Sequence, residues 1–480
     1  MIVNILLIFN FIALFVGGHE LIPAFGYGMT PWDISAILII LYSFKRLFWN
    51  GDRPKISRNH IYTGLVIFLA SVLISIFVPI FSGNRLFLLQ VIKTTVHLIF
   101  FITYFFSFIF LDINKEKIRV LFKALLIVAF ITNVFAVYQL FARIYDLPLK
   151  LITFYNSANV SRGKMEDNEI AQLTLQFENF TRATSYMSEP SALAGANCFF
   201  LLLTLVPYLT KQKQYFKSKV FNSLNLIFML LGLFLTFSLS GLLGLSLILS
   251  IAVFVHRRLS FSNLFKGLGV ALLIIILADV VAEKTFDISV LGLFGQRISS
   301  ILPIKNNKTE QIAGESLEHR QTTFERSYKI WKENPIIGIG IGLTSYHKEF
   351  DLAFSDTSIM AMMGEAGIIG GISMTLMFAF IFYYSYNIMK DKKLYDSEDG
   401  DIAILSAIVL YLFTIIFNSN YLVSNQIINT GYWHFFALIV AIINMCDNYR
   451  NKDIIEIKLI SEGLSTKLAK GLNNMKLSGK

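Results

Sequence analysis

The strongest constraint on the fold of this chain is a series of long apolar runs separated by short connections. Many of these runs approach the ~20 apolar residues that a helix needs to cross a bilayer. The chain has 480 residues, of which 55% are hydrophobic and 15% charged, and its mean hydropathy is +0.61. The runs are too long and too continuously apolar for the strands of a membrane barrel. The sequence therefore predicts an all-α polytopic integral membrane protein.

The positions of the basic residues predict the topology. Lysine and arginine gather in short connections on one side of the predicted helices, which the positive-inside rule assigns to the cytoplasm. Two long connections, 142–189 and 282–355, then lie on the external side. We expect both termini inside, with residues 1–445 as a single transmembrane domain and 446–480 as a basic cytoplasmic tail. About twelve spans are expected by length and hydropathy, at approximately 2–16, 33–48, 62–81, 86–111, 120–141, 190–209, 221–237, 241–255, 268–281, 357–388, 402–417 and 431–445.

Several classes of function are excluded or disfavoured. The net charge of +10 is explained by the cytoplasmic connections, so nucleic acid is not an expected partner. Cys198 and Cys446 lie in or beside apolar runs, which argues against a disulfide framework as the basis of the fold. The chain has no P-loop and no paired histidine spacing of the HExxH kind, so neither an ATP-driven pump, a metal site nor a cofactor is predicted. Residues 1–18 lack a basic start and are expected to be the first span rather than a cleavable signal peptide.

One predicted span carries ionisable residues. In span 86–111, Lys93 and His97 share a helical face with Gln90, and Arg85 lies at the outer mouth. Ionisable groups inside a span are functional candidates. The alternative is that Lys93, about two turns from the outer end, extends its ammonium group to the interface. Both interpretations stay open from the residues alone.

The end of the first external loop holds an arginine close to the membrane. Pro190 fits the first turn of the next span, and Ser188 or Glu189 would cap that helix. Arg182 would then lie just above the membrane, where a guanidinium fork could bind a lipid-borne pyrophosphate bidentately and stabilise it as a leaving group. The alternative is a surface arginine paired with an acid or a lipid head group.

The second external loop contains a charged, aromatic and glycine-punctuated stretch, 318–342. A helix over 320–333 would place on one face Arg320, Phe324, Tyr328 and Trp331, with Arg326 off that face. Asn334-Pro335 would end the helix, because proline disfavours helical geometry in the residue before it. The glycines that follow would let the backbone turn closely or offer its amides to an anion: Gly338, Gly340 and Gly342.

The start of span 357–388 carries two carboxylates. Asp356 is either a helix N-cap or a carboxylate able to orient or deprotonate a hydroxyl. Glu365 lies about nine residues deeper on the opposite face and needs a polar partner inside the bundle. Glycines on another face favour close helix packing, at Gly364, Gly367 and Gly371.

Four sequence motifs together resemble a known superfamily. They are RATSYMSEPSAL at 182–193, LTFSLSGLLGL at 235–245, the arginine, tryptophan and NPIIGIGIG pattern of 320–342, and DTSIMAMMGEAGIIGG at 356–371. In order and spacing, these motifs resemble the bacterial O-antigen polymerase (Wzy-type) and O-antigen ligase superfamily. The resemblance covers roughly residues 60–445.

The resemblance implies a multi-pass protein of the bacterial inner membrane that transfers glycans without a metal. Its members act on polyprenyl-pyrophosphate-linked oligosaccharides at the periplasmic face, and periplasmic arginines hold the pyrophosphate. By motif match, Arg182 and Arg320 would have that role. Asp356 stands where the ligase pattern has histidine, which favours a polymerase and makes Asp356 the candidate to orient the acceptor. Leu239 replaces an arginine that is usual in the family, a second departure.

The expected partners follow from the same resemblance. They are the lipid-linked oligosaccharide, the bilayer and a chain-length regulator protein. Further substrate contacts are expected at Glu189, Lys93, His97, Arg326 and Glu365. Two alternatives to a polymerase remain: a ligase that transfers finished glycan to another acceptor, and a lipid-linked oligosaccharide flippase. A flippase should carry charges along many spans and needs no large external loops, so the sequence favours an enzyme.

Overall fold

Helices dominate the part of the chain that the computed structural model describes. That part comprises residues 1–15, 21–24, 27–51, 60–82, 85–111, 113–155, 169–172, 176–177, 180–187, 189–209, 213–238, 241, 244–246, 261–286, 289, 291–292, 295, 324–343, 358–390 and 430–461. The helices are α1 (Ile2–Phe15), α2 (Pro31–Phe48), α3 (His60–Ser75), α4 (Phe77–Ser82), α5 (Arg85–Ile109), α6 (Lys115–Ile144), α8 (Pro190–Leu209), α9 (Lys219–Leu235), α11 (Phe261–Phe286), α14 (Ser358–Lys390) and α17 (Thr430–Ser461).

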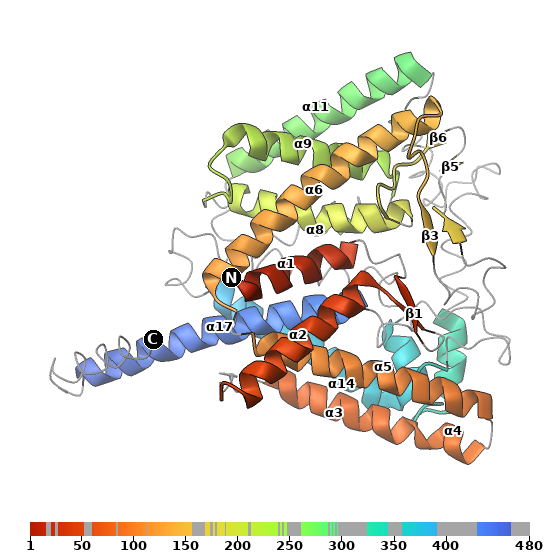
Figure 1. Ribbon diagram of the computed structural model, residues 1–480, viewed down its shortest axis with the longest axis vertical. Helices are drawn as coiled ribbons and strands as arrows, with labels where there is room; N and C mark the ends of the chain where they lie inside the picture. Colours follow the sequence, from red (N-terminus) through yellow and green to blue (C-terminus); the bar gives the residue numbers. More distant parts are fainter. Residues whose placement is uncertain are drawn as a thin grey trace.

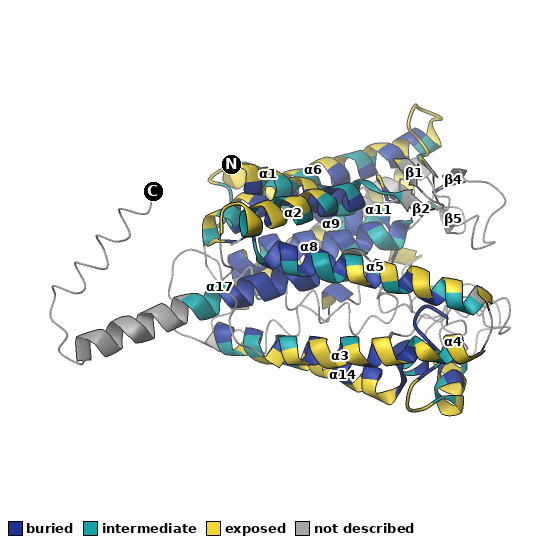
Figure 2. Ribbon diagram, turned by 60° about the horizontal axis from the view of Figure 1, so that its bottom comes forward, coloured by how far each residue is buried: buried dark blue, intermediate teal, exposed yellow. Residues whose placement is uncertain are grey.

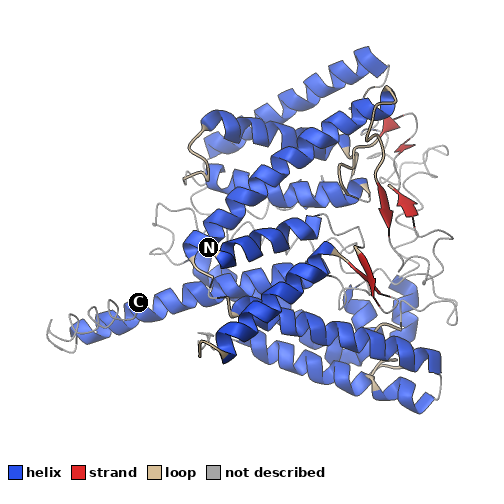
Figure 3. Ribbon diagram, viewed as in Figure 1, coloured by secondary structure: helices blue, strands red, loops and turns tan. Residues whose placement is uncertain are grey.

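Short strands form three two-stranded antiparallel ribbons at one end of the helices (Figures 1 and 3). The strands are β1 (Ile22–Ala24), β2 (Tyr27–Met29), β3 (Thr153–Tyr155), β4 (Glu169–Ala171), β5 (Gln176–Phe177) and β6 (Phe180–Thr181). Phe154 pairs with Ile170 in the ribbon of β3 and β4. In Figure 1 the strands lie at the right, whereas α1 begins and α17 ends at the left. All six strands of the described residues belong to connections between helices, so the fold class predicted from the sequence, an all-α architecture, describes the body of the protein.

Five of the described helical segments are long and apolar enough to cross a membrane: His60–Phe81, Phe87–Ile109, Lys115–Ile144, Pro190–Leu209 and Ile359–Ile388. Three shorter apolar helices accompany them, Ile2–Phe15, Lys219–Leu235 and Trp433–Asn448. Ten of the predicted spans overlap helices, although α11 begins well before residue 268 and α17 ends well after residue 445. Predicted span 241–255 is described only at 241 and 244–246, and span 402–417 lies outside the described residues. The total of about twelve spans therefore stays a prediction.

Local sequence explains where several helices begin and end. Thr30 caps α2, since its hydroxyl accepts from the Asp33 amide and the Asp33 carboxylate accepts from the Thr30 amide at 2.8 Å. Asn114 and Ser218 cap α6 and α9 by accepting from the amides of Lys117 and Phe221. A turn at Ile76 separates α3 from α4, because Pro79 cannot donate to the carbonyl of residue 75.

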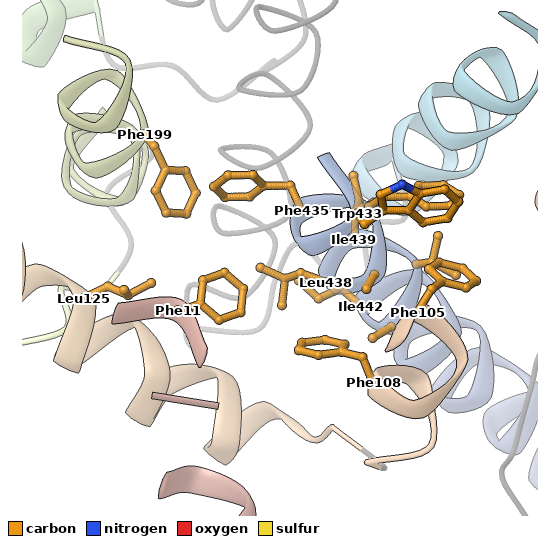
Figure 4. Packing of buried hydrophobic residues seen from close by; sticks show 14 of the residues in the cluster. Phe11, Phe105, Phe108, Leu125, Phe199, Trp433, Phe435, Leu438, Ile439 and Ile442 are labelled. Atoms are coloured by element: carbon orange, nitrogen blue, oxygen red, sulfur yellow. The ribbon is translucent and has the colours of Figure 1, made fainter. Parts of the chain in front are cut away.

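Helix α17 lies at the centre of the hydrophobic core. In Figure 4 its residues between Trp433 and Ile442 lie among Phe11 of α1, Phe105 of α5 and Phe199 of α8. Figure 2 shows buried residues along α8 and α17 and many exposed ones along α3 and α5. The exposed faces of α3 and α5 are themselves apolar, with Val66 at 64% and Leu89 at 63% exposure. Such faces are suited to lipid contact.

A buried polar network fixes α17 to the helices around it. Trp32 Nε1 donates to His434 Nδ1 at 2.7 Å, and the Tyr104 hydroxyl donates to Asn10 Oδ1 at 2.8 Å and lies 3.4 Å from the same Nδ1. Asn10 in turn donates to Ser35 Oγ at 2.7 Å. These five residues come from α1, α2, α5 and α17. Because polar groups in an apolar interior must find partners, the network specifies how the four helices pack. Helix α17 also continues past the predicted span, to Ser461 in the predicted tail.

Candidate functional site

Arg143, near the carboxyl end of α6, is the centre of a polar cluster at the end of the molecule that carries the strands. Its guanidinium donates to four acceptors: the carbonyl of Lys150 at 2.8 Å, Gln172 Oε1 at 2.7 Å, Thr184 Oγ1 at 2.7 Å and the carbonyl of Arg182. Each of these four acceptors is uncharged. We refer to Gln139, Arg143, Gln172, Arg182 and Thr184 as the arginine cluster.

Gln172 connects the arginine cluster to the chain that leads into α8. The residue is 4% exposed. Its Oε1 accepts from Gln139 Nε2 at 2.8 Å as well as from Arg143, and its Nε2 donates to the carbonyls of Ser185 at 2.7 Å and Met187 at 2.8 Å. A glutamine side chain has two donor hydrogens and one acceptor oxygen, and here all of them are used. Gln172 therefore holds residues 185–187 against the end of α6.

Arg182 lies between the ends of two helices. It is 8% exposed, and its Nε donates to the carbonyl of Thr236 at 2.7 Å. The next amide, that of Ala183, donates to the carbonyl of Leu235 at 2.8 Å. These carbonyls end α9, where unsatisfied acceptors and the negative end of the helix dipole favour a cation. The predicted site arginine is thus held at the carboxyl end of α9.

The backbone on both sides of this contact is strained. Ser185 has φ of 55° and Phe237 has φ of 48°, in the left-handed region that non-glycine residues seldom adopt. The Ser185 hydroxyl is fixed by a 2.7 Å bond to the carbonyl of Thr132. Such conformations persist only where the surrounding contacts determine them, and they concentrate at functional sites.

The turn after α6 is closed by a side-chain pair. Lys150, whose carbonyl accepts from Arg143, bonds through its ammonium group to the carboxylate of Asp146. That hydrogen bond and the charge of Lys150 lower the pKa of the Asp146 carboxyl. The turn is therefore stabilised above the acidic range, where the carboxylate is ionised.

Glu189 starts α8. Its carbonyl accepts from the Ala192 amide at 3.2 Å, and its carboxylate accepts from the Ser191 hydroxyl at 2.6 Å. With Pro190 in the first turn, this arrangement agrees with the helix start predicted from the sequence. A substrate contact by Glu189 stays a prediction.

A second cluster forms where residues 334–343 pack into a break in α14. Ala366 has φ of −120° and Gly367 has φ of 68°, so helical geometry is interrupted inside a candidate membrane span. Three main-chain bonds cross the contact: Ile339 N to Gly364 O, Gly340 N to Glu365 O and Ile368 N to Pro335 O, each 2.9 Å. The inserted segment satisfies backbone groups that the break releases from the helix. We call residues 334–343 the glycine wedge.

The glycines make this close contact possible. A Cβ on Gly367 would come within 1.8 Å of the Ile336 oxygen, and one on Gly338 within 2.4 Å of the Glu365 oxygen. The amides of residues 338, 339 and 340 all donate to carbonyls, those of Asn334, Gly364 and Glu365. Of the two roles expected for these glycines, close turning is therefore the one that the structure shows, since these three amides bind main-chain oxygens rather than an anion.

The other side of the glycine wedge contacts α5. Gln90 Nε2 donates to the Gly342 carbonyl at 3.3 Å, and a Cβ on Gly342 would lie 2.1 Å from Thr94 Oγ1. Lys93 and His97 lie on the same broad face of α5 as Gln90, by helical spacing. Glu365, 1% exposed, directly precedes the break in α14. The glycine wedge thus contacts both the polar face of α5 and the region of α14 around Glu365.

Arg326 lies in the helical stretch 324–333, beside this second cluster. Ser327 and Ile330 are the buried residues of the stretch, and Ile330 Cγ2 would be 3.3 Å from a Cβ on Gly364. Phe324 and Tyr328 on the aromatic face are 47% and 45% exposed. Exposed aromatic side chains of this kind suit contact with a membrane surface. Arg320 and Asp356, the other two predicted catalytic residues, lie outside the described residues.

Four members of the arginine cluster were not predicted from the sequence as site residues: Gln139, Arg143, Gln172 and Thr184. Gln139 and Arg143 did leave a signal, because polar residues spaced by four at the end of an apolar run share one helical face. Gln172 left none, since its partners are mostly main-chain atoms distant in sequence. Among the described residues, no group of three or more His, Cys, Asp or Glu side chains is arranged to hold a metal ion.

Comparison with known proteins gives a family for part of the chain. Residues 224–372 match the family model described as O-antigen ligase. The match confirms the resemblance to the O-antigen polymerase and ligase superfamily, and at family level it supports an enzyme of that type. It includes most of α9, the glycine wedge and the break in α14. Together with the apolar helices, it indicates a multi-pass membrane protein. The curated proteins contain no match to the chain.

Proposed function

We propose that the protein is a polysaccharide polymerase that joins polyprenyl-pyrophosphate-linked oligosaccharide repeat units at the periplasmic face of the bacterial inner membrane. The observation that carries this proposal is the setting of Arg182. Arg182 is 8% exposed, with its guanidinium bonded to the end of α9 and its main-chain carbonyl to Arg143 of α6, and an arginine held in this way is a suitable group to bind a diphosphate at the membrane surface. It lies next to the region that matches the O-antigen ligase family.

In the proposed reaction, a sugar hydroxyl of one lipid-linked unit attacks the anomeric carbon of another. A new glycosidic C–O bond forms, the bond from the anomeric carbon to the pyrophosphate oxygen breaks, and the hydroxyl proton passes to a base. Polyprenyl pyrophosphate leaves with the electron pair. The negative charge that develops on the leaving oxygen is the quantity that arginine stabilises.

Arg182 and Arg320 are the proposed partners of the diphosphate. The 2.7 Å bond from Arg182 Nε to the Thr236 carbonyl fixes the plane of the guanidinium, and a planar fork that is already oriented loses little entropy when it binds. Asp356 is proposed to orient or deprotonate the acceptor hydroxyl. Lys93, His97, Glu189, Arg326 and Glu365 are proposed to contact the substrate, and both termini are proposed to be cytoplasmic. A separate chain-length regulator protein is the proposed partner.

Ligation of a finished glycan to another acceptor is the second candidate. It shares the donor, the bond broken and the arginine chemistry, and the description of the matching family, O-antigen ligase, favours it. Polymerase is preferred because Asp356 occupies the position of the histidine in the ligase pattern. A flippase is the least favoured, because the strained backbone at Ser185 and Phe237 and the buried cluster around Arg182 suit fixed geometry rather than transport.

Gene deletion in the native host tests the proposal. A polymerase predicts that the deletion removes the glycan ladder while single repeat units still reach the surface. Long lipid-linked polymer that accumulates without transfer would identify a ligase instead, and single units trapped on the inner leaflet would identify a flippase.

A further inference from the structure

We propose that Arg143 is a positioning residue, which sets the Arg182 guanidinium through the main chain of residues 182–187. The inference rests on the proposed function, in which Arg182 binds the diphosphate. Arg143 does not itself contact the substrate in this account. It acts by holding the segment that carries Arg182 in one conformation.

The first support for this role is the direct contact between the two arginines. Arg143 Nη1 donates to the carbonyl of Arg182, and Nη2 donates to Thr184 Oγ1 at 2.7 Å. Thr184 also donates from its hydroxyl to Gln139 Oε1 at 3.0 Å. Arg182 is therefore fixed at its own carbonyl and at the second residue after it, both times by the end of α6.

The second support is that the same segment is attached on its other side to α9. The bonds from Arg182 Nε to Thr236 and from the Ala183 amide to Leu235 make that attachment. Residues 182–184 thus bridge α6 and α9. Removal of the α6 contacts would leave the Arg182 side chain bonded to α9 while its main chain was free to shift.

The third support is the strained backbone of Ser185, which needs surrounding contacts to persist. Ser185, directly after the bridge, has φ of 55°, which a non-glycine residue keeps only under constraint. Gln172 supplies part of that constraint through the Ser185 carbonyl, and Arg143 orients Gln172 through its Oε1. Loss of Arg143 would therefore release the strained residue as well as the Arg182 carbonyl.

Only arginine can make this set of contacts. The four acceptors come from three separate stretches of chain, at residue 150, at residue 172, and at residues 182 and 184. A guanidinium presents five donor hydrogens in a planar fork, whereas lysine presents three on one atom and glutamine two. The charge alone is not what the site requires, since the four acceptors are neutral. Lysine at 143 should therefore fail to restore function, which separates positioning from a charge effect.

The experiment is a double-mutant cycle on the full-length protein in lipid nanodiscs. The quantity measured is kcat/KM for polymerisation of lipid-linked repeat units extracted from a strain that lacks the gene. Arg143→Gln and Arg143→Lys should each lower kcat/KM by about tenfold or more, the effect of losing hydrogen bonds to a charged group. Arg46→Gln is the matched control, because Arg46 also donates to a carbonyl, that of Phe110 at 3.2 Å, in the last turn of a helix.

The second half of the cycle measures the effect of Arg143→Gln in the Arg182→Lys protein. If Arg143 acts through Arg182, then Arg143→Gln should have little further effect there. An equal tenfold loss in both backgrounds would overturn the inference, as would wild-type kcat/KM in Arg143→Gln or full rescue by Arg143→Lys. If the Arg182→Lys protein turns over too slowly to measure, the same cycle is run on binding of polyprenyl pyrophosphate, with the same expected non-additivity.

A further variant tests whether Arg143 acts through its bonds to the segment that carries Arg182. Thr184→Val removes one acceptor of Arg143 with little change in shape, and its effect should shrink in the Arg143→Gln background, where only the bond from Thr184 to Gln139 is still lost; an undiminished effect there contradicts the inference. If wild-type protein makes no polymer, the proposed function fails, while the binding cycle still decides whether Arg143 sets Arg182.

Discussion

Gly367, in the break of α14, lies directly against the carbonyl oxygen of Ile336, where a Cβ would approach to 1.8 Å. The contact joins a candidate membrane span to the glycine wedge, and main-chain bonds on both sides of it replace helical ones. A broken helix inside a membrane needs such replacements. The wedge is therefore part of the helical core as well as part of the connection that carries Arg326.

Gly367→Ala should destabilise the protein more than alanine does at a helical glycine whose neighbours leave room for a Cβ. The new Cβ meets backbone atoms, which cannot move aside, and φ of 68° is strained for alanine. We expect a loss of at least about 3 kcal/mol from strain and overpacking together, seen as a lower temperature of thermal unfolding in detergent.

Gly64→Ala is the control for that substitution. Gly64 of α3 also faces α14, but its Cβ would meet Met377 atoms at 3.4 Å, an ordinary contact. Equal unfolding temperatures for the two variants would contradict the described break in α14.

Gly232→Ala should disturb a buried amide pair. Asn133 and Asn197 exchange two hydrogen bonds of 2.8 Å between α6 and α8, and a Cβ on Gly232 would lie 1.8 Å from Asn133 Oδ1. The expected cost is about 2 kcal/mol of overpacking and lost hydrogen bonding, measured by thermal unfolding.

The cause can be checked in an Asn133→Ala, Asn197→Ala background, where the crowding is gone. Gly232→Ala should cost clearly less there, because contacting residues are non-additive. The same cost in both backgrounds would rule out the amide pair as the source.

Trp32→Phe should loosen α17. The change removes the donor to His434 Nδ1 and leaves a polar atom buried among aromatic rings. We expect a destabilisation of about 1–3 kcal/mol, the cost of an unsatisfied buried group, in thermal unfolding. Trp49→Phe, at a side chain that is 86% exposed, should have almost no effect; a similar loss for both would mean that the bond contributes nothing specific.

Gln172→Glu should impair function more than stability. The substituted oxygen would face the carbonyls of Ser185 and Met187, to which Nε2 now donates, and like partial charges repel. We expect about a tenfold fall or more in donor affinity as the Arg182 segment shifts. Binding of polyprenyl pyrophosphate in nanodiscs measures this, and unchanged affinity would argue against the coupling.

Much of the fold could be predicted because membrane helices are specified by local sequence. The start and end predicted for the helix at 190–209 match α8, since Pro190 and the apolar run determine them. The break in α14 could not be predicted: GEAG reads as helix packing, and only the distant Pro335 and Gly340 reveal that the backbone leaves helical geometry.

The site could be predicted in part, because a charged residue beside an apolar run is visible in the local sequence. Arg182 stood out as a charged residue next to a predicted span, and the structure places it, 8% exposed, in the arginine cluster. Its supports, Arg143 and Gln172, bind mainly to carbonyls and neutral side chains, and such partners leave no pattern in a sequence. The glycines of the wedge were found, but their role required knowledge of what lies opposite each one.

The most direct measurement is reconstitution of the purified protein in lipid with lipid-linked repeat units as the sole substrate, followed by electrophoresis of the glycan. We expect an evenly spaced ladder from wild-type protein and none from a folded Arg182→Ala protein. A full ladder from Arg182→Ala would contradict the proposed role of the arginine. If correctly folded wild-type protein made no polymer, the proposed polymerase function would be contradicted.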